Sequence, residues 1–171
     1  MQKEILDACC GGRMFHFDKQ RPDVLFMDCR THSETLDSGH IINVDPDIIG
    51  DFRDMPFGDD SFHLVIFDPP HLLRAGDNSW MKKKYGVLQK DTWKQDLTQG
   101  FNECMRVLKP GGTLIFKWND TQIALPELLP LFDATPIIGQ KRQKTHWLVF
   151  YKSFAVNNPK TKEEVAHGDI R

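Results

Sequence analysis

The sequence predicts a single α/β domain with a mostly parallel sheet of about seven strands, one of them antiparallel. Two observations support this prediction. Short apolar runs alternate with helical or long polar segments from Ile5 onward, as in strands joined by crossovers. The last two runs, residues 135–140 and 146–152, flank a short basic turn. Such a hairpin places one antiparallel strand near the edge of the sheet.

Composition restricts the class of protein. The chain has 171 residues, a net charge of −2 and 40% hydrophobic residues, which suits one globular domain with a core of its own. We assign residues 1–154 to this domain and residues 155–171 to a polar tail. No apolar run approaches the length of a membrane span, and no export signal precedes the first strand. We therefore expect a cytoplasmic protein that does not bind membranes.

The cysteines predict free thiols and no metal site. Four cysteines in a chain without an export signal are typical of a reducing cytoplasm. Cys9 and Cys10 are adjacent, and Cys29 with His16 or His32 could complete a zinc site. Their spacing matches no zinc-binding pattern, so we predict that no metal is bound.

The first half of the chain supplies three short strands. Residues 5–8 form the first and end in the small-residue turn of residues 9–12, after which residues 13–19 are a brief helix at most. Residues 24–27 form the second strand and end in Asp28. The polar interval of residues 30–46 has no helical period and is expected to be a loop with an irregular hairpin. Residues 48–49 form the third strand.

The second half of the chain supplies a buried strand, a long helix and the closing hairpin. After the strand of residues 64–67, residues 72–93 show no clear period and are expected to cover the site as a lid. Residues 97–108 have helical spacing, with Asp91 or Thr92 as a cap and an end at residues 109–112. A strand over 113–118 and a broken short helix over 123–132 follow.

The most informative segment is Leu64-Val-Ile-Phe-Asp-Pro-Pro-His71. Its apolar run predicts a buried strand, which delivers Asp68 to the carboxyl edge of the sheet, where open α/β folds bind ligands. Pro69 and Pro70 lack backbone N–H groups, so this corner presents hydrogen-bond acceptors only. Such a corner suits a planar –NH2 group, which has two hydrogens to donate. The alternative is an ordinary turn at the end of a strand.

Four segments in order resemble the class I S-adenosylmethionine-dependent methyltransferases, and within them the branch that methylates exocyclic amino groups. They are Ile5-Leu-Asp-Ala-Cys-Cys-Gly-Gly12, Asp28 at the end of the second strand, residues 50–62, and Asn102-Glu-Cys-Met-Arg-Val-Leu-Lys-Pro-Gly-Gly-Thr-Leu114, with Asp-Pro-Pro-His at the fourth strand. The resemblance covers residues 5–152 and implies a Rossmann-like fold with S-adenosyl-L-methionine as cofactor. It also implies a role for Asp7, facing the cofactor's ammonium group.

Other cofactor contacts are implied in the same way. Asp28, with Cys29 beside it, corresponds to the acceptor for the ribose hydroxyls, and Asp51 and the Phe52 N–H to the contacts with adenine. Both carboxylates could instead be ordinary polar residues at strand ends. The turn that brings backbone N–H groups to the ligand consists of Ala8, Cys9, Cys10, Gly11 and Gly12.

The sequence departs from the family pattern at the cofactor turn. Cys9 stands where the family has its first glycine, and Arg13 stands where a third often occurs. The helix that often precedes the first strand is missing.

The resemblance assigns the chemistry to Asp68, Pro69, Pro70 and His71. The Asp68 carboxylate and the Pro69 carbonyl accept the two hydrogens of an aromatic amine, so that its lone pair is directed at the methyl group. Once the methyl group has moved, Asp68 or water takes the released proton. His71 stands where the family carries an aromatic residue that stacks on the target base, although it could be an ordinary turn histidine.

Two basic and aromatic patches suit phosphate contact and base stacking. Because the overall charge is balanced, a site for nucleic acid has to be a local patch of this kind. The alternative for each patch is a set of solvated lysines beside core aromatics, and Lys117 fits a strand residue that points outward. The substrate-binding candidates are Trp80, Lys82, Lys83, Lys84, Trp118, Asn119, Lys141, Arg142 and Lys144.

We therefore predict a nucleobase amino-methyltransferase that acts on DNA, at adenine N6. The same chemistry on RNA is the second interpretation, and a small-molecule or protein-amide methyltransferase is the third. A fourth is a non-catalytic subunit that keeps the fold, although such a subunit has no need of an intact Asp68-Pro69-Pro70. The chain has no room for a separate target-recognition domain, so we expect modest specificity, or specificity supplied by a partner or a homodimer.

Overall fold

The computed structural model describes residues 3–76 and 79–154 and shows one α/β domain with a seven-stranded mixed sheet. The strand order is β5-β2-β1-β6-β7-β9-β8, and β9 runs antiparallel to both of its neighbours. The predicted fold class is therefore confirmed. The strands are β1 (Ile5–Asp7), β2 (Val24–Asp28), β5 (Ile48–Ile49), β6 (Phe62–Phe67), β7 (Leu108–Asn119), β8 (Ile138–Arg142) and β9 (Thr145–Tyr151). The predicted tail at 155–171 lies outside the described residues.

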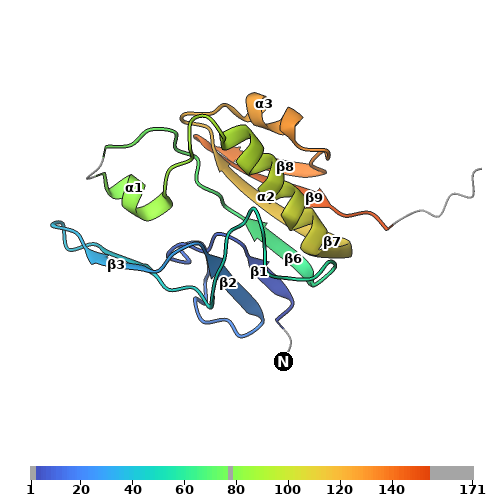
Figure 1. The fold of residues 1–171 in the computed structure, drawn as a ribbon, viewed down its shortest axis with the longest axis horizontal. Helices are drawn as coiled ribbons and strands as arrows, with labels where there is room; N and C mark the ends of the chain where they lie inside the picture. The colour runs from blue at the N-terminus through green and yellow to red at the C-terminus, as the bar shows by residue number, and fades with distance from the viewer. Residues whose placement is uncertain (1–2, 77–78, 155–171) are drawn as a thin grey trace, which may run out of the picture.

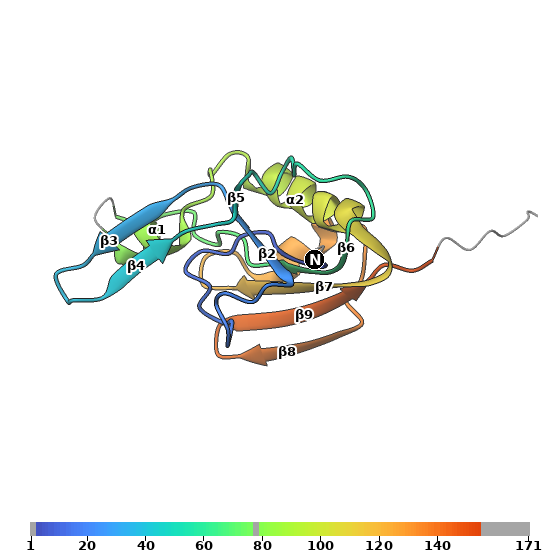
Figure 2. The same ribbon diagram turned by 90° about the horizontal axis from the view of Figure 1, so that it is seen from below.

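The helices are unevenly distributed around this sheet. The long helix α2 (Trp93–Val107) lies across one face, and α3 (Leu125–Leu128) with a 3₁₀ turn at Leu129–Leu131 lies on the same side (Figures 1 and 2). The short helix α1 (Trp80–Tyr85) lies apart, beside a hairpin of β3 (His32–Thr35) and β4 (Ile41–Val44). None of these helices is long and apolar enough to cross a bilayer.

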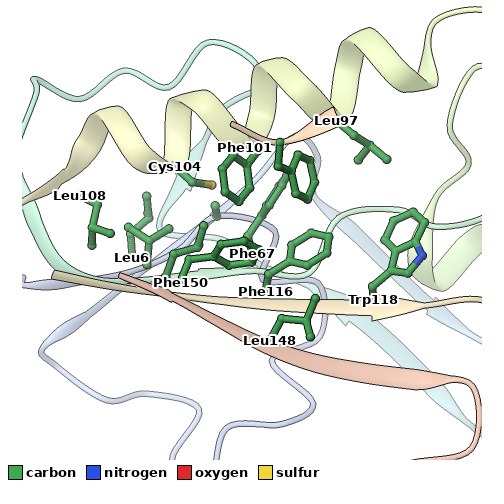
Figure 3. Close-up of a cluster of buried hydrophobic side chains, with 14 of the residues drawn as sticks. Leu6, Phe67, Leu97, Phe101, Cys104, Leu108, Phe116, Trp118, Leu148 and Phe150 are labelled. Atoms are coloured by element: carbon green, nitrogen blue, oxygen red, sulfur yellow. The ribbon is translucent and has the colours of Figure 1, made fainter. Parts of the chain in front are cut away.

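The core lies between α2 and the sheet (Figure 3). The helix presents Leu97, Phe101 and Cys104 to the strands, and all three are at most 1% exposed. Phe101 stacks on Phe132 with ring centroids 4.1 Å apart. Burying such aromatic side chains contributes about 1.5–3 kcal/mol each, so this face fixes the positions of the strand ends.

Residues 13–19, expected to be a brief helix at most, form turns, and the Arg13 side chain donates hydrogen bonds to the carbonyls of Lys19 and Asp45 across this loop. Two local predictions differ from the structure. Helix α2 ends at Val107, and β7 begins at once, because residues 111 and 112 exchange backbone hydrogen bonds with Lys152. The interval 72–93, expected to lack regular structure, contains α1.

Candidate functional site

The carboxyl ends of the central strands open on a cavity of about 360 Å³, within the size range of small-molecule sites. One end is formed by residues 8–12 after β1, Asp28 and Cys29 after β2, and Phe52. The other end is formed by Asp68 and its neighbours after β6, by α1, and by the last residues of β7. A single hollow therefore joins the segments predicted to bind a cofactor with those predicted to bind a target.

The turn after β1 is tied to Asp28. Gly11 has a φ of +46°, a left-handed conformation that glycine adopts at little cost. Its N–H donates to Asp28 Oδ2 at 3.0 Å, and the Arg30 N–H lies 3.3 Å from Oδ1. The Cys29 thiol lies 3.7 Å from the same Oδ1, whereas Oδ2 keeps a further lone pair, so Asp28 can still accept a hydrogen bond from a ligand in the cavity.

Asp7 occupies a different place from the one predicted. Its side chain is fully buried, accepts a hydrogen bond from the Cys9 N–H at 3.4 Å and lies 2.8 Å from His16 Nε2. Burial raises the pKa of Asp7, and the contact with His16 opposes this. Asp7 does not line the cavity, because side chains alternate along β1 and its carboxylate faces His16. The structure therefore does not bring Asp7 to the cavity wall, and its contact with a cofactor ammonium group stays a prediction.

Asp51 also points away from the cavity. Its two oxygens accept hydrogen bonds from Arg53 at 2.6–3.1 Å, and it is absent from the cavity wall, contrary to the prediction. Phe52 does line the cavity, and its ring packs 5.4 Å from that of Phe67. A Cβ on Gly100 of α2 would lie only 2.3 Å from Phe52, so the glycine allows the ring to sit there.

Asp68 forms the floor of the target end. Its side chain is only 12% exposed, and Oδ2 accepts a hydrogen bond from Lys117 Nζ at 2.5 Å. No described residue donates to Oδ1. Burial raises the pKa of Asp68 to about 6, and the charge of Lys117 opposes the rise. Pro70 and His71 line the cavity with Asp68, whereas Pro69 is not part of its wall.

Lys117 is the most important residue that the sequence analysis missed. It was assigned as an outward strand residue, yet it lines the cavity and pairs with Asp68. Phe116 and Trp118 on either side face α2, so Lys117 faces the opposite side at the end of β7. The alternation along β7, together with the pairing of β6 and β7, could have indicated that Lys117 lies beside Asp68.

Aromatic rings flank the Asp68–Lys117 pair. His71 is 5% exposed and lies 5.3 Å from the ring of Tyr85, and Lys84 Nζ lies 5.1 Å from the same ring. Burial and the charge of Lys117 lower the pKa of His71 to about 4, so its imidazole is neutral at neutral pH. Lys117 Nζ itself lies 5.6 Å from the ring of Phe15. The target end is therefore flat-walled, with two ammonium groups.

The other predicted substrate residues divide into two groups. Trp80, Lys84 and Asn119 line the cavity. Trp118 does not: it is fully buried and its indole N–H donates to the Ile123 carbonyl at 3.0 Å, so the structure does not bring it to the cavity. The predicted residues that lie outside the cavity are Lys82 and Lys83, which border a separate groove, and Lys141, Arg142 and Lys144 on the hairpin of β8 and β9.

The remaining cavity residues were not singled out from the sequence. They come from segments without a recognisable motif: Met14, Phe15, Arg30, Met81, Gly86 and Thr145. Within residues 3–76 and 79–154, no three histidine, cysteine, aspartate or glutamate side chains gather as metal ligands would.

Solved structures share this fold. The PH0226 protein of Pyrococcus horikoshii OT3 is 16% identical, with a TM-score of 0.57 over 90% of this chain and 83% of that chain. The Haloferax volcanii complex of the Trm112 methyltransferase activator and the putative methyltransferase matches at 14% identity and a TM-score of 0.51, over 90% and 83%. A TehB-like SAM-dependent methyltransferase from Corynebacterium glutamicum matches at 18% and 0.50, over 89% and 81%. No family model matches the sequence, and no curated protein is significantly similar to it.

Proposed function

We propose that this protein is an S-adenosylmethionine-dependent methyltransferase that acts on the exocyclic amino group of a nucleobase, with adenine N6 in DNA as the first target to test. The observation that carries the proposal is the position of Asp68, whose Oδ1 lacks a donor among the described residues and whose cavity also contains the turn at residues 8–12 and Asp28. Two of the proteins with the same fold are named as methyltransferases, which agrees with it.

The residues present fit S-adenosylmethionine. Oδ2 of Asp28 retains a lone pair that can accept a hydrogen bond from a ribose hydroxyl, and Gly11 and Gly12 keep the turn free of side chains where a ligand approaches. When bound, the cofactor supplies an electrophilic methyl group on a sulfonium sulfur. Asp7 and Asp51 are engaged with His16 and Arg53, so Asp28 is the carboxylate at that end of the cavity that we assign to cofactor binding.

Asp68 positions the target amine. An aromatic amine is a weak nucleophile because its lone pair is delocalised into the ring. Oδ1 of Asp68 accepts one of its hydrogens, which favours a pyramidal nitrogen with its lone pair directed into the cavity. The Pro69 carbonyl, predicted from the sequence as the second acceptor, belongs to a residue outside the cavity wall, so its contact stays a prediction. Attack then depends mainly on orientation, the effect that contributes most to rate in such transfers.

Lys117 keeps Asp68 able to accept those hydrogens. A carboxyl as buried as Asp68 tends to become protonated, and a protonated carboxyl would donate a hydrogen where an acceptor is needed. The Lys117 ammonium stabilises the carboxylate through Oδ2 and leaves Oδ1 for the substrate. The neutral ring of His71 supplies a flat wall without competing for the carboxylate.

A nucleobase reaches such a cavity only when it is out of its stack, from a single strand or by flipping from a duplex. The experiment that tests the proposal is transfer of a tritiated methyl group from S-adenosylmethionine to DNA, RNA and protein pools, followed by mass analysis of the nucleosides. N6-methyl-2′-deoxyadenosine from DNA or N6-methyladenosine from RNA supports the proposal, and which of the two is found decides between the polymers. Label in protein or small molecules alone would overturn it.

A further inference from the structure

Next to the cavity lies a second hollow, a groove of about 920 Å³ bordered by residues 73–76 on one side and by α1 and residues 86–90 on the other. It shares Arg30 and Gly86 with the cavity that contains Asp68. The two hollows are therefore neighbours, with Arg30 and Gly86 forming part of both walls.

The groove is strongly basic in a chain whose net charge is −2. Of the described residues, all the charged ones that line it are cations or histidine: Arg30, His32, Arg74, Lys82, Lys83 and Lys90. Lys83 is paired with Glu34. Arg74 and Lys90 are exposed, and in the part of the chain that the structure describes no acidic side chain pairs with either. These two charges are available to an external anion.

The walls of the groove are held by polar contacts. The Gln122 side chain makes three hydrogen bonds with the loop at Arg74. Its Oε1 accepts from the Leu73 and Arg74 N–H groups at 2.7 and 2.9 Å, and its Nε2 donates to the Arg74 carbonyl at 2.8 Å. Arg30 donates to the Lys83 carbonyl at 2.6 Å and so holds the end of α1. The Leu88 N–H donates to the Leu72 carbonyl at 2.8 Å and joins the two sides.

We propose that this groove binds the sugar–phosphate backbone next to the target nucleotide, so that the substrate is a polynucleotide strand and not a free nucleotide. The inference rests on the proposed function. A single nucleotide would occupy the end of the cavity at Asp68, whereas a strand also carries phosphates into the groove, where Arg74 and Lys90 have no acidic partner among the described residues. An acidic peptide would match the charge, but it has no base for the flat-walled cavity that the groove joins.

The test measures binding without methyl transfer. Binding of fluorescein-labelled 12-nucleotide DNA and RNA strands is followed by anisotropy between 50 and 200 mM KCl, using wild type, Arg74→Ala, Lys90→Ala and the double variant. Each lost phosphate contact with a single strand reduces the slope of log affinity against log salt by about 0.7, and the double variant by about 1.4. Lys19→Ala removes an exposed lysine outside both hollows and is the control, with an unchanged slope expected.

Unchanged slopes in Arg74→Ala and Lys90→Ala, with circular dichroism showing both variants folded, would overturn the inference. The inference would also be overturned if poly-glutamate displaced the labelled strand as effectively as unlabelled strand does. That result would assign the groove to an acidic protein. If the slopes fall as expected but no methyl group is transferred to any polynucleotide, the groove stands and the proposed function fails. The DNA and RNA arms identify which polymer binds more tightly.

Discussion

Replacing Lys117 by Met removes the charge that faces Asp68 while keeping a long apolar side chain. In the wild type, burial and Lys117 together place the pKa of Asp68 at about 6. An opposite charge in contact lowers the pKa of a carboxyl by about 1–3. Loss of the Lys117 charge is therefore expected to raise the pKa of Asp68 by the same amount. At pH 7 the ionised fraction then falls from about nine tenths to between about one half and one hundredth.

The consequence is a displaced pH profile. Because only ionised Asp68 keeps Oδ1 as an acceptor for the amine, kcat/KM for methyl transfer falls as pH drops through the folded pKa. The wild-type acid limb is expected near pH 6, and the Lys117→Met limb about 1–3 pH units higher, with activity recovering in alkaline buffer. At pH 7 the variant should be about 2-fold to 100-fold slower.

The assay is tritiated methyl transfer from pH 5 to 10, paired with a ¹³C NMR titration of the Asp68 carboxyl carbon. Lys117→Arg retains the positive charge and is the matched control, with an acid limb close to that of the wild type. An acid limb that stays near pH 6 in Lys117→Met would refute the assigned role of Lys117. A displaced NMR titration without a displaced rate profile would show that Asp68 ionisation does not limit the reaction.

Two further predictions concern the cofactor end. Asp28→Ala removes the acceptor that holds the Gly11 N–H, so the Kd for S-adenosylmethionine measured by calorimetry should rise about 10-fold to 100-fold. The control is Asp37→Ala, at an exposed carboxylate. An unchanged Kd for Asp28→Ala would show that Asp28 does not bind the cofactor. Gly100→Ala places a methyl group 2.3 Å from Phe52 and should lower the free energy of unfolding in urea by about 1–3 kcal/mol, with weaker cofactor binding. The control is Gly58→Ala, whose Cβ would meet only Ser61 at 3.8 Å; it should change neither the free energy of unfolding nor cofactor binding. If Gly100→Ala also left both unchanged, the ring of Phe52 would not be held against Gly100.

The sheet and the position of Asp68 could be predicted because both depend on local patterns. A run of apolar residues that ends at two prolines defines a buried strand and its carboxyl end without knowledge of any other segment. The hairpin of β8 and β9 was predicted for the same reason. Helix α1 was missed because it has only six residues, and its N-cap Ser79 makes no side-chain capping bond; such a helix depends on its tertiary contacts.

Local patterns in the sequence do not predict which side chains pair with the carboxylates Asp68 and Asp7. The Asp68–Lys117 pair joins residues 49 positions apart and depends on the register of β6 against β7, in which Phe67 lies opposite Phe116. Asp7 was assigned to the cofactor from its position in the motif, although strand alternation places its side chain on the face opposite Leu6, where His16 meets it. The Asp51–Arg53 pair is local, and its spacing of two residues could have indicated that Asp51 is engaged.

The central claim is that Asp68 holds the target amine and takes no part in binding the cofactor. The most direct measurement compares wild type and Asp68→Ala for two quantities in parallel: methyl transfer to a polynucleotide and the Kd for S-adenosylmethionine. We expect transfer to be lost in the variant while the Kd changes little. Retained transfer, or a Kd that weakens as much as the rate falls, would contradict the account.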